Sequence, residues 1–144
     1  MKETVCAITG AIGGCVSGLL GGWTAALTTL CIFMVIDYLT GLIVAGVFHA
    51  SPKTESGALE SRAGLKGLMR KGMMLLIVLM GYRLDLASGL NMIKDGVCIA
   101  FILNEVLSIT ENAGLMGIPI PAVITKAIDI LSKPAAEEPA QKTD

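Results

Sequence analysis

The sequence predicts an all-α integral membrane protein with three to four transmembrane helices and a C-terminal amphipathic helix. Of its 144 residues, 53% are hydrophobic and only 16% are charged, whereas an ordinary soluble domain carries about 25% charged residues. A soluble chain of this size has too much surface to bury so much apolar material. In addition, no charged residue occurs from Thr4 to Ile36. We therefore expect lipid to surround most of the chain.

The uncharged N-terminal run is too long to cross a membrane as one straight helix. It would extend about 50 Å at ~1.5 Å per residue, and the hydrocarbon core is only ~30 Å thick. Gly21-Gly22-Trp23 is the expected break, because glycines weaken a helix and tryptophan prefers the membrane interface. We predict a first helix over about residues 4–20 and a second over about 23–48, in which Asp37 is the one charged residue.

A basic loop follows the second helix. Ser51-Pro52 ends that helix, and glycines loosen the stretch that leads to the next apolar segment. Basic residues exceed the acidic Glu55 and Glu60 here, so the positive-inside rule places the loop in the cytoplasm. The basic residues of this predicted cytoplasmic loop are Lys53, Arg62, Lys66, Arg70 and Lys71.

The remaining segments complete a membrane domain over residues 1–133. We expect a third helix at about 72–90 and a fourth at about 96–112. Apolar residues at helical spacing then predict an amphipathic helix at about 121–133. The polar residues 134–144 have the composition of a disordered tail. If the basic loop is cytoplasmic, the third helix leaves the cytoplasm and the fourth returns, so the C-terminus is cytoplasmic too.

The position of the N-terminus stays open in the sequence. If the first helix spans, the protein crosses the membrane four times and the N-terminus is inside. If that helix lies in the interface or does not insert, there are three crossings and the N-terminus is outside.

A line of small residues on the first helix predicts self-association. Residues four apart share one helix face, and helices in lipid associate through close backbone approach at such faces. The alternative is packing within one subunit. Two residues of the second helix offer a smaller surface of the same kind. The predicted oligomerisation face comprises Gly10, Gly14, Gly18, Gly22, Gly41 and Ala45.

Asp37 is the most unusual residue of the second helix. An ionised carboxylate in lipid costs several kcal/mol, so it should face protein, water or a basic partner. Arg83 and Lys94 belong to the other side of the membrane in this topology. A water-lined lumen or a contact between subunits is therefore the preferred interpretation, and a protonated, hydrogen-bonded structural aspartate is the alternative.

The fourth helix carries a broad polar band on an otherwise apolar segment. Such a band suits a bundle interior or a wet lumen better than lipid. Glu105 is its deepest acid, and a proton-coupled transport site there is an alternative interpretation. Together with Asp37, the predicted intramembrane polar residues are Asn104, Glu105, Ser108, Glu111 and Asn112.

Several functional classes are disfavoured. The net charge of −1 argues against nucleic-acid binding, which needs a clustered basic surface. The single histidine, His49, belongs to no catalytic triad or zinc motif. The four cysteines form no Cys-x-x-Cys pair and behave as small hydrophobic residues. We expect no enzymatic activity, no metal and no cofactor.

Two blocks of sequence resemble a known family. Asp37-Tyr38-Leu39-Thr40-Gly41 is similar to a signature of the phage lysis and toxin-secretion holin family, the group that includes clostridial toxin-secretion holins. The run from Asn104 to Asn112, closed by Gly117-Ile118-Pro119-Ile120-Pro121, is similar to that family's glutamate-x-leucine-serine-isoleucine-x-glutamate-asparagine segment and its glycine-x-proline-x-proline exit. The blocks occur in the family's order and at a similar distance, and the likeness spans about residues 32–133.

The resemblance implies a small protein of the bacterial cytoplasmic membrane that forms homo-oligomers and opens lesions. An endolysin or a toxin would then be the released cargo, leading to host cell lysis or to secretion, and an antiholin is an implied regulatory partner. The alternatives are a small ion or solute transporter or channel subunit, and an antiholin that restrains a partner holin.

Overall fold

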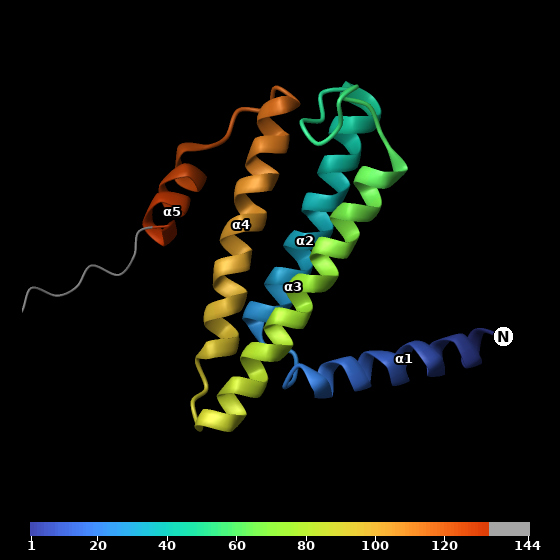
Figure 1. Cartoon of the computed structure of the whole chain (residues 1–144), viewed down its shortest axis with the longest axis vertical. Helices are drawn as coiled ribbons and strands as arrows, with labels where there is room; N and C mark the ends of the chain where they lie inside the picture. The colour runs from blue at the N-terminus through green and yellow to red at the C-terminus, as the bar shows by residue number, and fades with distance from the viewer. Residues whose placement is uncertain (133–144) are drawn as a thin grey trace, which may run out of the picture.

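The computed structural model describes residues 1–132, which form helices and no strand (Figure 1). This confirms the all-helical class for the described residues, and the predicted tail at 134–144 lies outside them. A short π-helical turn, η1, continues the second helix. The elements are α1 (Lys2–Leu19), α2 (Ala25–Ile43), η1 (Val44–Phe48), α3 (Ser61–Ser88), α4 (Ile93–Leu115) and α5 (Ala122–Ser132).

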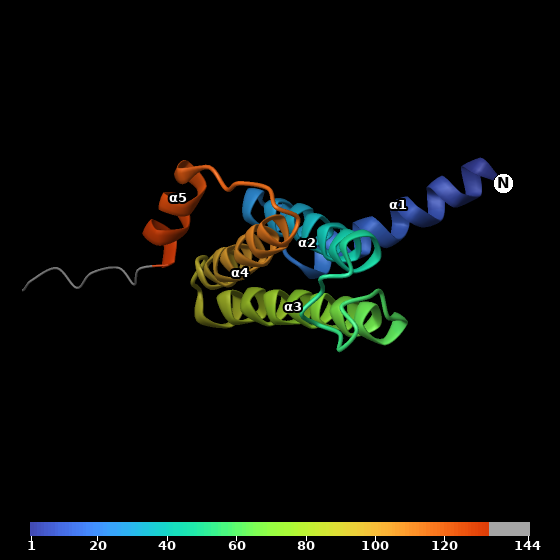
Figure 2. The ribbon, with the colours of Figure 1, turned by 90° about the horizontal axis from the view of Figure 1, so that it is seen from above.

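Helices α2, α3 and α4 form a three-helix bundle, which Figure 2 shows from above. Helix α4 packs against both α2 and α3, whereas α2 and α3 contact each other sparsely. The core fills the half of the bundle nearest the start of α2, where Leu27, Leu30, Val78 and Cys98 are fully buried. Leu20, Met34 and Met74 complete this cluster.

Helix α2 is the most hydrophobic helix among residues 1–132. Thr24 caps its start, because the Thr24 hydroxyl accepts a hydrogen bond from the backbone N–H of Leu27 at 3.2 Å. Together with η1 it runs to Phe48, where the left-handed backbone of His49 ends it. Within residues 1–132, this 24-residue segment is the one helix long and apolar enough to cross a membrane. That finding supports the predicted membrane class but not the predicted number of crossings.

Helix α3 begins at Ser61, whereas the sequence predicted a loop up to Lys71. Four of the five basic residues expected in the loop (Arg62, Lys66, Arg70 and Lys71) are therefore helical, and only Lys53 lies in the loop. Gly64 and Gly67, which were expected to loosen this stretch, lie against Tyr38 of α2. A Cβ atom at Gly64 would be 3.6 Å from the Tyr38 hydroxyl, so the small residues give α3 room beside that ring.

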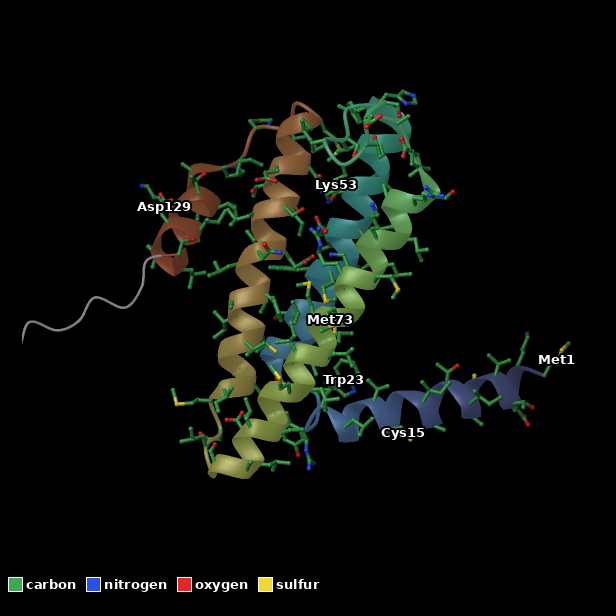
Figure 3. All side chains as sticks on the ribbon, viewed as in Figure 1. Met1, Cys15, Trp23, Lys53, Met73 and Asp129 are labelled. Carbon is green, nitrogen blue, oxygen red and sulfur yellow. The ribbon has the colours of Figure 1, made fainter. Side chains whose placement is uncertain are left out.

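Helix α1 projects sideways from the bundle and has no buried residue (Figure 1). Side chains along it, from Met1 past Cys15, point into open space (Figure 3). Gly21 and Gly22 connect it to α2 with φ angles of 73° and 86°, which favour glycine. A Cβ atom at Gly21 would also collide with the ring of Tyr82. The predicted break is thus a sharp turn that sets the direction of α1.

Polar contacts hold this end of the bundle together. The Asp85 carboxylate accepts hydrogen bonds from the backbone N–H groups of Met92, Ile93 and Lys94 at 2.8–3.1 Å, and so caps α4. The Lys94 ammonium donates to the carbonyl of Gly22 at 3.0 Å. Lys94 is therefore engaged with the α1–α2 turn, at the opposite end of the bundle from the loop.

Helix α5 lies beside α4 (Figures 1 and 2) and is almost entirely exposed. Its exposed apolar residues include Val123, Ile124 and Leu131. The observed bounds agree with the predicted amphipathic segment up to Ser132.

Candidate functional site

The centre of the bundle holds one buried ion-pair cluster, formed by Asp37, Lys71 and Glu105. Each helix contributes one side chain: Asp37 from α2, Lys71 from α3 and Glu105 from α4. The Lys71 ammonium donates to Asp37 Oδ2 at 2.8 Å and to Glu105 Oε2 at 2.5 Å. The three side chains are 9%, 11% and 3% exposed, respectively. A single cation therefore joins all three helices of the bundle.

Two neutral polar residues extend this cluster. Asn112 of α4 donates its amide N–H groups to Asp37 Oδ1 at 3.3 Å and to the Thr40 hydroxyl at 2.9 Å. The Thr40 hydroxyl in turn donates to the backbone carbonyl of Asp37. Within residues 1–132, no buried side-chain nitrogen or oxygen atom lacks a hydrogen-bond partner. The polar groups at the centre are thus satisfied inside a single chain.

Asp37 lies near the middle of the 24-residue apolar segment from Ala25 to Phe48. If that segment spans a membrane, the cluster is near the centre of the hydrocarbon core. Unpaired charges are most expensive there, whereas charges that face the bundle interior and pair with each other are tolerated. Breaking such a pair is strongly destabilising, because it leaves an uncompensated buried charge. The cluster therefore fixes how the three helices face one another.

A cavity of about 60 Å³ borders the cluster on the side of the loop. It has room for water, since a site needs about 10–15 Å³ of such volume for each molecule. Its lining includes the buried Asp37 and Lys71 and also loop residues such as Lys53 and Thr54. The Lys53 label in Figure 3 marks this end of the bundle. On the opposite side of the cluster, the apolar core around Met34, Met74 and Val78 closes the bundle.

The structure divides the polar residues that the sequence singled out. Asp37, Glu105 and Asn112 are buried together, Ser108 is half-buried, and Asn104 and Glu111 are exposed on α4. The broad polar band of α4 is therefore two surfaces, one inside the bundle and one outside. The preferred interpretation of Asp37, as facing a water-lined lumen or a second subunit, is therefore wrong for this structure. Asp37 forms an ion pair with Lys71 of the same chain.

Lys71 is the residue whose role the sequence did not indicate. It is the last basic residue before the apolar part of α3, and the charge pattern assigned it to a loop with its four basic neighbours. Unlike the exposed Arg62, Lys66 and Arg70, it is buried. The sequence signal that could have indicated this role is the position of Lys71 directly before the apolar part of α3. If α3 is extended toward its N-terminus, as in the structure, Lys71 lies inside the helix and can reach Asp37.

The predicted oligomerisation face is also divided. Gly10 and Gly14 of α1 are exposed, as is Gly18, and a Cβ atom at each would meet nothing within 4 Å. Gly22 belongs to the turn after α1. Gly41 lies beside Asn112 of α4, and Ala45 is buried in the same chain. Only the α1 glycines form an open surface.

The chemistry of the cluster is limited to ion pairing, hydrogen bonding and proton exchange. In residues 1–132, no three His, Cys, Asp or Glu side chains are grouped so that they could hold a metal ion. The carboxylates of Asp37 and Glu105 instead share one ammonium group.

Comparison with known proteins identifies a family and several relatives. The bacteriophage holin family matches residues 14–133. An uncharacterised protein of Halalkalibacterium halodurans is 38% identical over 126 residues, covering 83% of this chain and 87% of that protein. An uncharacterised Clostridium perfringens protein is 33% identical, with 84% and 87% covered. A probable holin of Bacillus phage phi105 is 34% identical over 113 residues, with 78% of each chain covered. No solved structure matches.

Replacing the shared cation tests whether the cluster holds the bundle together. We expect Lys71→Met to lower the free energy of unfolding in detergent micelles by about 3–5 kcal/mol, because the two buried acidic side chains lose their shared cation. The matched control Lys66→Met, at an exposed position of the same helix, should change it by less than about 0.5 kcal/mol. Unfolding is followed by circular dichroism during titration with a denaturing detergent.

A triple variant separates loss of charge balance from loss of packing. Asp37→Leu, Lys71→Met and Glu105→Leu together remove every charge of the cluster, and we expect stability near that of the unmodified chain. Equal stability of Lys71→Met and Lys66→Met would show that the cluster does not hold the bundle.

Proposed function

The chain belongs to the bacteriophage holin family, and on this premise we propose that it is a holin. It oligomerises in the bacterial cytoplasmic membrane and forms lesions through which an endolysin or a toxin leaves the cell. The family match over residues 14–133 is the observation that carries this proposal. The similarity to a protein described as a probable holin, and the apolar α2, support it.

The proposed orientation follows from the charges at the two ends of the bundle. On the exposed side of α3, Arg83 lies toward the α3–α4 turn and Met73, Leu76 and Met80 precede it, whereas three basic residues, Arg62, Lys66 and Arg70, lie at the loop end. With Lys53, this end is the more basic, so we place it in the cytoplasm. Helices α2, α3 and α4 then each cross the membrane, and α5 and the C-terminus lie on the cytoplasmic side.

We propose three crossings rather than four, with the N-terminus outside. In Figure 1 helix α1 runs across the bundle direction rather than along it. Its C-terminal end lies beside the exposed Trp23 (Figure 3), a residue that favours the interface. A helix in the plane of the outer interface would direct Ile8 and Ile12 toward lipid. Gly14 follows Ile12 by two residues and therefore lies on the opposite face of α1. That face is free to contact a second copy of the chain.

The structure alters the proposed driving force for assembly. Asp37, Glu105 and Asn112 are already paired within one chain, so a monomer can insert without showing them to lipid. The exposed Asn104 and Glu111 of α4 remain on the outer surface. Polar groups in that position gain by turning toward other copies or toward water. Monomers can therefore accumulate in the membrane without permeabilising it, and they assemble as their density rises.

Expression in a bacterium tests the function directly. We expect an abrupt loss of membrane potential, followed by escape of cytoplasmic proteins when a cell-wall hydrolase is co-expressed. The readouts are a potential-sensitive dye and a cytoplasmic enzyme in the medium, with the hydrolase alone as control. Solute-specific flux without killing would instead indicate a transporter or channel subunit. No effect alone but delayed lysis beside a known holin would indicate an antiholin, and either result contradicts the proposal.

Labelling with a membrane-impermeant thiol reagent tests the orientation. In a variant without its four cysteines, Asn91→Cys, in the α3–α4 turn, and Glu3→Cys, in α1, should react in intact cells before lysis. Ser56→Cys, in the loop, should react only after permeabilisation, because the basic end is cytoplasmic. Labelling of Ser56→Cys in intact cells would reverse the orientation, and protection of Glu3→Cys would favour four crossings.

Bulky substitutions on α1 test the oligomerisation face. We expect Gly14→Leu with Gly18→Leu to reduce cross-linked oligomers and delay lysis, because leucine prevents close backbone approach. The control Ile8→Leu with Ile12→Leu alters the opposite face and should leave both readouts unchanged. Normal oligomers and timing in the glycine variant would reject this role for α1.

A further inference from the structure

The buried cluster contains more acid than base. Asp37 and Glu105 bring two carboxyl groups to the single ammonium of Lys71. If all three were ionised, the bundle would carry one uncompensated negative charge near the middle of its most apolar helix. A buried charge without a partner is so costly that such a group normally neutralises instead. One proton removes this excess and leaves an ion pair beside a neutral carboxylic acid.

Within residues 1–132, no other cation pairs with Asp37 or Glu105, and the buried Lys94 is engaged with the Gly22 carbonyl at the opposite end of the bundle. The described titratable groups that face the cluster or line its cavity come from α2, α3, α4 and the loop. At the mouth of the cavity, Lys53 and Glu60 are both exposed and carry opposite charges. The full set is Asp37 and Tyr38 of α2, Lys71 of α3, Glu105 of α4, and Lys53 and Glu60 at the mouth.

The polar cavity connects the cluster to the loop end of the bundle. Its lining joins the Asp37–Lys71 pair to Ser51, Lys53 and Thr54 of the loop, and it has room for water. Toward the other end Val78 and Leu30 are fully buried, and the groove between α2 and α3 that also reaches Lys71 is lined mainly by apolar side chains. Exchange with solvent therefore takes place on the side of the loop.

We infer that the Asp37–Lys71–Glu105 cluster is a proton-binding site, loaded from the loop end, whose single proton holds the three-helix bundle closed. When that proton leaves for water in the cavity, the second carboxylate becomes ionised and the cluster gains a net negative charge. The closed bundle then loses stability as the pH on the loop side rises. The consequence for lesion formation rests on the proposed function, but proton binding itself does not.

Infrared spectroscopy of the full chain in phosphatidylethanolamine–phosphatidylglycerol vesicles tests the proton directly. We expect the carbonyl band of a protonated carboxyl group at neutral pH in the unmodified protein. Glu105→Gln and, separately, Asp37→Asn should abolish it, because the one remaining carboxylate pairs with Lys71. The control Glu55→Gln, at an exposed loop position, should retain it. Absence of the band in the unmodified protein, or its persistence in both cluster variants, would overturn the inference.

The pH dependence of stability tests the proposed role of the proton. Loss of one proton on opening makes the unfolding equilibrium constant rise by up to about tenfold per pH unit, with stability greatest at low pH. Glu105→Gln mimics the neutral acid and should lack this slope, whereas Glu55→Gln should keep it. A slope of opposite sign, or the same slope in Glu105→Gln, would contradict the inference.

Release of a dye from the same vesicles separates this inference from the proposed function. Release that increases with pH in the unmodified protein but not in Glu105→Gln supports both. If the carboxyl band and the stability slope are present but no dye escapes at any pH, the proposed function fails and the proton site stands. Release without the band or the slope sustains the function and refutes the proton site.

Discussion

Among residues 1–132, Lys71 supplies the one positive charge at the point where α2, α3 and α4 bring Asp37 and Glu105 together. It bonds Asp37 and Glu105 simultaneously, so none of the three helices can rotate or slide without breaking an ion pair in an apolar interior. Under the proposed three crossings, apolar packing alone would specify helix position loosely, because lipid tails are as apolar as the side chains they replace. The polar cluster adds the missing specificity, and the contact of Asn112 with Asp37 and Thr40 fixes the register of α4 on α2.

Under the proposed function, the protein accumulates in the membrane before it acts, and this arrangement makes such accumulation possible. A chain with intramembrane carboxylates should insert poorly or aggregate early, because exposed polar groups in lipid seek partners. Here Asp37 and Glu105 are buried within one chain, whereas the α1 glycines and the polar Asn104 and Glu111 of α4 stay exposed. Under the proposed function, closed monomers are the stored form, and loss of the cluster's proton weakens them.

The two ends of the bundle differ in construction. At the α1–α2 end, Asp85 caps α4 and Lys94 holds the carbonyl of Gly22, so backbone and side chains form a rigid corner. At the loop end, a cavity reaches down to Asp37. Any opening of the bundle is therefore expected to begin near the loop.

The sequence by itself determined the all-helical class, the break at Gly21-Gly22, the family and the basic end of the bundle. Each of these depends on composition, local propensity or short motifs, which neighbouring residues settle among themselves. Only the tertiary structure decided that Lys71 is buried between Asp37 and Glu105, that Gly41 and Ala45 face inward, and that α1 leaves the bundle. Periodicity shows which residues share a helix face, but the partner of that face depends on how three helices pack at once.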